Sequence, residues 1–143
     1  MAGWKHDQII LDKVFTVGPH TFRYYKFSLP EGPVNVAVMG QFSATAETQN
    51  PDKEMDNKDD SGIEVFVLTD AAFTVWQNGS AVSSIYDSGI VTVGTVQADI
   101  PAGAGAYYLV FSNKAAPKTA KSIHATILLR HKNWLRRAFT RKN

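Results

Sequence analysis

The chain of 143 residues contains no cysteine, which excludes disulfides, a thiol nucleophile and every cysteine-based zinc or iron–sulfur site. It also lacks the run of about 18–20 apolar residues that a membrane-spanning helix requires. The first seven residues do not form the apolar stretch of a signal peptide. Two expectations follow: the protein is cytoplasmic, or the chain has been separated from a leader or an anchor.

Catalytic motifs are missing as well. The sequence has no Gly-x-Ser-x-Gly elbow, no phosphate-binding Walker loop and no dinucleotide fingerprint. Metal-ligand spacing is not found between any two of the four histidines, His6, His20, His124 and His131. We therefore expect a protein that is not an enzyme and needs no cofactor, with calcium as the one cofactor left open below.

What is present is a globular composition. Hydrophobic residues make up 44% of the chain and charged residues 20%, an ordinary balance for one folded domain. A domain of this length buries roughly 68–70% of the surface that its unfolded chain exposes. One hydrophobic core is enough to hold such a domain together.

Short strand-like runs recur along the chain and are separated by glycine, proline, asparagine and aspartate. Within them apolar side chains alternate with polar ones, as in half-buried strands. Residues 70–76 are expected to form a short helical turn with Asp70 as its N-cap. The pattern predicts an all-β fold, an antiparallel, jelly-roll-like β-sandwich of about eight strands, with strands at residues 9–17, 21–29, 34–45, 63–68, 84–87, 90–100, 106–112 and 121–130.

Three segments together resemble bacterial GOLD-like β-sandwich domains, which are related in outline to pre-peptidase C-terminal domains. They are Tyr-Tyr-Lys-Phe-Ser-Leu-Pro-Glu-Gly at 24–32, Ile-Glu-Val-Phe-Val-Leu-Thr-Asp at 63–70 leading to Trp-Gln-Asn-Gly at 76–79, and the glycine-rich turn and aromatic strand at 101–114 that continue to residue 123. The resemblance covers roughly residues 14–130. It implies a bacterial, non-catalytic interaction module and favours an extracytoplasmic location. The sequence departs from the pattern in its longer acidic loop at 46–62 and in Ala115-Ala116 after the Asn-Lys pair.

Charge divides the chain into a body and a tail. Residues 1–129 carry nine lysines and arginines against thirteen acids, whereas residues 130–143 carry six basic residues and no acid. We expect a sandwich domain at 1–130 and a basic amphipathic tail at 131–143, the one place where a further helix could form. This tail could lie on an anionic membrane surface or dock on acidic protein surface, whereas nucleic acid is a less favoured partner; a frayed, solvated tail explains its composition equally well. Its candidate residues are Lys132, Trp134, Arg136, Arg137, Phe139 and Arg141.

Two further groups of residues could bind a ligand. Residues 46–62 hold six acids and could supply oxygen ligands to calcium through Asp56, Asp59 and Asp60, although the spacing is not that of an EF-hand and a solvated loop explains the acids as well. Aromatic rings beside amides and carboxylates suit the stacking of sugars. The best group for carbohydrate or partner binding is Trp76, Gln77, Asn78, Tyr86 and Asp87.

The leading hypothesis is a non-catalytic protein–protein interaction or assembly module that binds another protein or copies of itself. A carbohydrate-binding sandwich assisted by calcium and a membrane-surface adaptor acting through the tail are the alternatives. Such a module would bind through its exposed loops or through contacts between copies of the chain.

Overall fold

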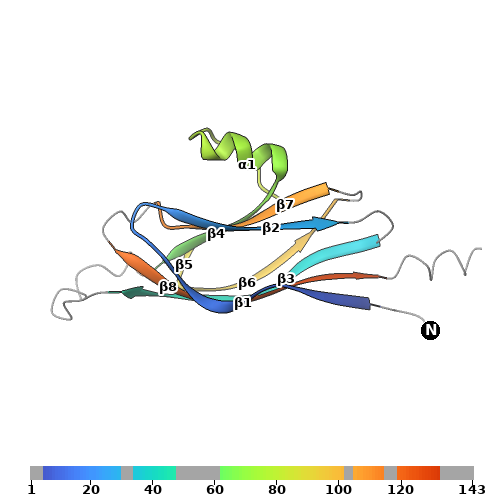
Figure 1. The fold of residues 1–143 in the computed structure, drawn as a ribbon, viewed down its shortest axis with the longest axis horizontal. Helices are drawn as coiled ribbons and strands as arrows, with labels where there is room; N and C mark the ends of the chain where they lie inside the picture. The colour runs from blue at the N-terminus through green and yellow to red at the C-terminus, as the bar shows by residue number, and fades with distance from the viewer. Residues whose placement is uncertain (1–4, 30–33, 48–61, 102–104, 115–118, 133–143) are drawn as a thin grey trace, which may run out of the picture.

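The computed structural model describes residues 5–29, 34–47, 62–101, 105–114 and 119–132. These residues form two four-stranded antiparallel sheets that face each other, with one helix outside the second sheet (Figure 1). Sheet A has the strand order β1-β8-β3-β6 and sheet B the order β2-β7-β4-β5. The predicted all-β sandwich of eight strands is confirmed. The elements are β1 (Lys5–Val17), β2 (Phe22–Leu29), β3 (Val34–Glu47), β4 (Ile63–Thr69), α1 (Asp70–Gln77), β5 (Tyr86–Val91), β6 (Val93–Asp99), β7 (Gly105–Ser112) and β8 (Ala120–Lys132).

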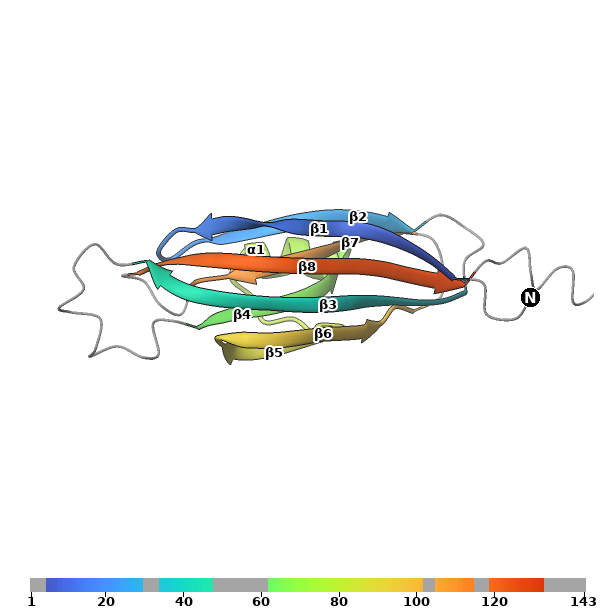
Figure 2. The same ribbon diagram turned by 90° about the horizontal axis from the view of Figure 1, so that it is seen from below.

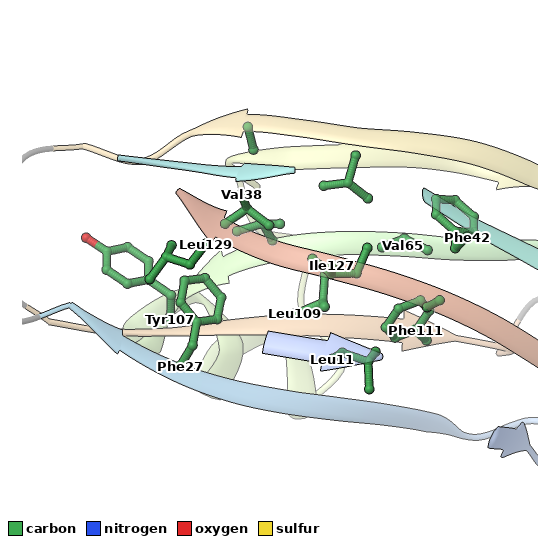
Figure 3. Packing of buried hydrophobic residues seen from close by; sticks show 14 of the residues in the cluster. Leu11, Phe27, Val38, Phe42, Val65, Tyr107, Leu109, Phe111, Ile127 and Leu129 are labelled. Carbon is green, nitrogen blue, oxygen red and sulfur yellow. The ribbon is translucent and has the colours of Figure 1, made fainter. Parts of the chain in front are cut away.

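The core lies between the two sheets and follows the alternation of the sequence. In β8 the odd-numbered residues from 121 to 129 are buried, and His124 and Thr126 between them are exposed. Phe111 of β7 lies between the sheets on the same side of the core as Phe42 (Figure 3), with its ring centroid 6.3 Å from that of Phe42 and 5.1 Å from that of Phe15. Each buried aliphatic side chain contributes about 1.5–3 kcal/mol, so a register slip of one residue would expose the whole set.

The N-cap of helix α1 is one residue earlier in the chain than the sequence predicted. The N-cap is Thr69, whose hydroxyl accepts a hydrogen bond from the Ala72 amide at 3.1 Å. Asp70, the expected N-cap, is instead the first helical residue and places its carboxylate in the first turn. Both residue types can cap a helix, and here β4 continues to Thr69, so that Thr69 has the extended backbone that an N-cap needs.

The boundary between the fifth and sixth strands also differs from the prediction. Ser88 and Gly89 were expected to end one strand, but they lie inside β5, where the pairing with β4 shifts register between Glu64 and Phe66. Gly89 adopts a φ of +67° there, a conformation that glycine tolerates best. The Ser88 hydroxyl accepts a hydrogen bond from the Val65 amide at 2.9 Å, in place of a backbone partner. The glycine therefore marks a β-bulge rather than a turn.

Strand β8 gives the sandwich its long axis and two distinct ends. At one end Glu47, the last residue of β3, pairs with Ala120, the first residue of β8. At the other end Lys132 pairs with Lys5 (Figure 2). The 13 residues of β8 span about 43 Å at 3.3 Å per residue. Glu47 and Lys132, the described residues that precede the acidic segment and the basic tail in the sequence, therefore lie at opposite ends of the sandwich. We call the end at Glu47 the acidic end and the end at Lys132 the basic end.

Candidate functional site

The outer face of sheet B is covered by helix α1. Phe73 of α1 stacks on Tyr108 of β7 with a centroid distance of 4.0 Å and an interplanar angle of 12°. Trp76 packs edge-on against Phe22 at 4.8 Å, and the Lys114 ammonium lies 4.5 Å from the Trp76 ring centroid. Trp76 is consequently half-buried in an aromatic cluster that fixes the helix to the sheet.

Tyr86 belongs to the other side of sheet B. Its ring packs against the main core, and its hydroxyl crosses to sheet A, where it donates a hydrogen bond to the Thr95 carbonyl at 3.0 Å. Burial, followed by the charge of Asp87, raises the pKa of the Tyr86 hydroxyl. The structure thus places Trp76 and Tyr86 in separate hydrophobic clusters and does not join them in one sugar-stacking surface.

The other members of that predicted group are also dispersed. Gln77 and Asn78 are exposed at the end of α1, where the Asn78 amide donates to the Val75 carbonyl at 3.1 Å as part of the C-cap. Asp87 accepts a hydrogen bond from the Gly89 amide at 2.8 Å and stabilises the bulge of β5. These contacts are those of structural residues, and carbohydrate binding by the group stays a prediction.

The remaining predicted site residues cannot be placed. Asp56, Asp59 and Asp60 lie outside the described residues, as do Trp134, Arg136, Arg137, Phe139 and Arg141; Lys132 is described only through its place at the end of β8. Within the described ranges, no three histidine or acidic side chains gather in a way that could hold a metal ion. None of the helices formed by these same residues has the length and apolar character needed to cross a membrane.

Asp87 forms a carboxyl pair with Glu64 of β4. Burial raises the pKa of Glu64 to about 7, assisted by a side-chain hydrogen bond to Asp87 and by the charge of Asp87. The folded protein thus favours the protonated form of Glu64 more than the unfolded chain does. The stabilisation that protonated Glu64 gives the folded state is fully present when the pH is below 4.5, the ordinary pKa of the group. This stabilisation is lost as the pH rises through about 7, the pKa in the folded protein.

We predict that the free energy of unfolding falls by about 1 kcal/mol between pH 4.5 and pH 8 because of Glu64, a value reduced from the full shift since the group is partly exposed. Glu64→Gln should remove this decline while keeping a hydrogen-bond donor toward Asp87. Urea unfolding of both proteins across this pH range measures the effect. An unchanged slope in the variant would show that Glu64 is not the responsible group.

The outer face of sheet A, by contrast, is open, since no described element lies over it (Figure 2). Near its centre a trough with a volume of about 700 Å³ crosses β3, β6 and β8. The trough is lined by polar and apolar side chains without a carboxylate, lysine or arginine among them; they include Gln41, Ser43, Thr95, His124, Thr126 and Leu128. Around it large apolar side chains face solvent: Val93 is 71% exposed, Val14 63% and Ile9 62%.

Residues of this face align in rows across the four strands because all neighbouring strands are in antiparallel register. The central row contains Asp12, Thr126, Gln41 and Thr95. A second row, toward the acidic end, contains Val14, His124, Ser43 and Val93. A third row, toward the basic end, contains Ile9, Leu128, Met39 and Gln97. We call these three rows, taken together, the open face.

The edges of sheet A are less available than its face. On one edge the Tyr86 hydroxyl bonds the Thr95 carbonyl of β6, as described above. On the opposite edge the Arg23 guanidinium donates to the Thr16 carbonyl of β1 at 3.3 Å. Side chains of sheet B thereby occupy carbonyl groups that an added strand would use, a common protection against edge-to-edge association.

A buried polar cluster lies at the acidic end of the sandwich. The Lys121 side chain is fully buried, and its ammonium donates to the Asn113 Oδ1 at 2.6 Å and to the Gly62 carbonyl at 2.8 Å. The Asn113 amide nitrogen donates to three carbonyl groups, those of Val17, Gly18 and Thr119. This cluster ties together the ends of β1, β4, β7 and β8.

The sequence did not predict that the residues of the open face, or those of the buried polar cluster, come together in the fold. The alternating pattern of β8 places His124 and Thr126 on its outer face, and both are exposed, but their neighbours in the rows come from β1, β3 and β6. A strand pattern does not say which strands pair, so the rows could not be assembled from it. Lys121 carried one signal, since it occupies an inward position of the alternating pattern in β8.

Comparison with known proteins does not assign the chain to a family: no protein-family model matches it, and no curated protein matches its sequence. The resemblance to GOLD-like domains stays a prediction.

Proposed function

We propose that this domain is a non-catalytic assembly module that binds further copies of its own chain through the open face of sheet A. The observation that carries the proposal is the asymmetry between the two sheets. Helix α1 and an aromatic cluster cover part of the outer surface of sheet B, where Tyr24 and Ile90 are 49% and 53% exposed, whereas sheet A leaves three large β-branched side chains more than 60% exposed. Exposed apolar groups that gather on one face are typical of interaction surfaces.

Two further features support assembly through this face. On each edge strand of sheet A, one carbonyl group accepts a hydrogen bond from a side chain of sheet B, which makes strand addition at that position less favourable. Trp76 and Tyr86 lie in separate clusters, so we rank assembly above the carbohydrate alternative. GOLD-like domains, which the sequence resembles, are non-catalytic interaction modules too, and the proposal agrees with that resemblance.

Sedimentation of the wild type and of a variant with Val14→Lys and Val93→Lys tests the proposal. Both valines are exposed, so the fold should persist, while like charges on both partners should raise the dissociation constant at least about tenfold. Val75→Lys is the matched control, because Val75 is 44% exposed on α1, in the layer that covers sheet B. A monomer at every concentration up to the millimolar range, or an equal effect of the control, would contradict the proposal.

A further inference from the structure

We infer that protonation of His124 dissociates the assembly formed through the open face, so that acidification returns the chain to single copies. This regulation rests on the proposed function and concerns the same surface. His124 is exposed on β8, one of the two inner strands of sheet A, and it lines the trough. Histidine is the residue type that ordinarily gains a charge between pH 8 and pH 5. The surroundings of His124 decide what such a charge does to the assembly.

A second copy would cover His124, because a stable interface needs nearly the whole sheet. The strands of sheet A have 13, 13, 14 and 7 residues. With a rise of about 3.3 Å per residue and a strand spacing of about 4.8 Å, they extend over about 750 Å². An interface of standard size buries about 800 Å² on each partner. His124, on an inner strand, would therefore lie inside the contact and not at its rim.

The side chains next to His124 on the open face carry no charge. They are Val14 of β1, Ser43 of β3, and Ser122 and Thr126 of β8. Hydroxyl and methyl groups of this kind give an imidazolium little compensation once water is removed. In a single copy water solvates the charge instead, since His124 is exposed.

Two described carboxylates lie around this group, and each already has a hydroxyl partner. Asp12 of β1, diagonal to His124, accepts a hydrogen bond from the Thr126 hydroxyl at 3.1 Å. Glu47, at the end of β3, accepts one from the Thr16 hydroxyl at 3.1 Å. Within the described ranges neither carboxylate forms an ion pair with His124. A protonated imidazole therefore depends on water, which a second copy would displace.

The second copy supplies no opposite charge in either symmetric arrangement of the two faces. A two-fold interface uses the same surface of both copies. With the axis along the strands, between β8 and β3, His124 faces Ser43 of the second copy; with the axis along the central row, it faces Leu128 of the second copy. Each interface would then hold two unpaired cations, and burying an unpaired charge is costly. Protonation consequently disfavours assembly in both arrangements.

Sedimentation equilibrium of the wild type at pH 7.5 and pH 5.5 tests the inference. Because each of the two histidines must lose its proton on assembly, the dissociation constant should rise at least about tenfold at pH 5.5. His124→Gln keeps a neutral hydrogen-bonding side chain and should assemble equally at both pH values. His124→Lys carries a permanent charge and should assemble weakly at both.

His20→Gln is the matched control, because it makes the same chemical change in the turn between β1 and β2, where His20 is exposed outside the open face. This variant should keep the pH dependence of the wild type. Circular dichroism at both pH values checks that the sandwich stays folded. Glu64 should not unfold it at pH 5.5, because this group, with a pKa raised to about 7, stabilises the folded state at the lower pH.

An unchanged dissociation constant of the wild type between pH 7.5 and pH 5.5 would overturn the inference and leave the proposed function intact. The same would follow if His124→Gln weakened at pH 5.5 as much as the wild type, or if the wild type lost its β-sheet signal there. A chain that is monomeric at pH 7.5 at every concentration contradicts the proposed function itself. The two failures are therefore distinguishable.

Discussion

Replacing Asn113 by alanine is expected to lower the free energy of unfolding by about 1.5–3 kcal/mol, the range for a hydrogen bond to a charged group. Asn113 is 1% exposed and Lys121 is fully buried. The substitution would take the Oδ1 acceptor from the Lys121 ammonium and leave a charge in the interior with fewer partners. It would also remove the donor to the carbonyls of Val17, Gly18 and Thr119, and unsatisfied buried acceptors are costly.

Urea unfolding followed by circular dichroism measures this loss. Lys121→Met should be destabilising for the converse reason, since the Asn113 Oδ1 and the Gly62 carbonyl would lose a donor. Residues that share one network do not add, so Asn113→Leu combined with Lys121→Met should cost less than the sum of the two single changes. If each single variant lost less than about 1 kcal/mol, the cluster would not be holding the strand ends together.

The strands and their inward faces could be predicted because the side-chain period of two is a local property. The inward positions of β8 and the aromatic face of β7 with Tyr107, Leu109 and Phe111 are confirmed. The bulge at Gly89 was not predicted, because a glycine after serine indicates a turn as well as a bulge, and only the partner strand β4 decides between them. Thr69 and Asp70 are likewise both capable of capping, and the end of β4 decides which does so.

The candidate site depends on pairing that no local pattern contains. Val14, His124, Ser43 and Val93 form one row, although up to 110 residues separate them in the sequence. Trp76 and Tyr86 are only ten residues apart, yet a strand of sheet B separates their clusters, because α1 lies outside the sheet and Tyr86 packs inside it. Nearness in the sequence suggested a single group there, whereas the structure places the two rings on opposite sides of sheet B. The rows of the open face follow from the sheet order β1-β8-β3-β6.

Gly40→Ala is expected to cost about 3 kcal/mol or more, since overpacking a rigid core costs 1–3 kcal/mol and here the obstacle is backbone. Gly40 lies in the middle of β3, where a Cβ atom would clash with the Thr126 carbonyl oxygen and stand 2.8 Å from the Ile127 Cα. Neither atom belongs to a flexible side chain. β3 and β8 would have to separate locally, and this pair of strands forms the middle of sheet A.

Gly18→Ala is the matched control, because it makes the same chemical change where a Cβ atom would meet only the Thr21 hydroxyl at an ordinary contact distance of 3.5 Å. The free energy of unfolding of that variant should change by less than about 1 kcal/mol, with a gain expected from the reduced entropy of the unfolded chain. Thermal and urea unfolding of both variants give the comparison. Equal stabilities for the two would mean that β3 and β8 approach each other less closely at Gly40 than the structure shows. A large loss of stability confined to Gly40→Ala would show that β3 and β8 can pair this closely only because residue 40 has no side chain. This close pairing aligns the rows of the open face.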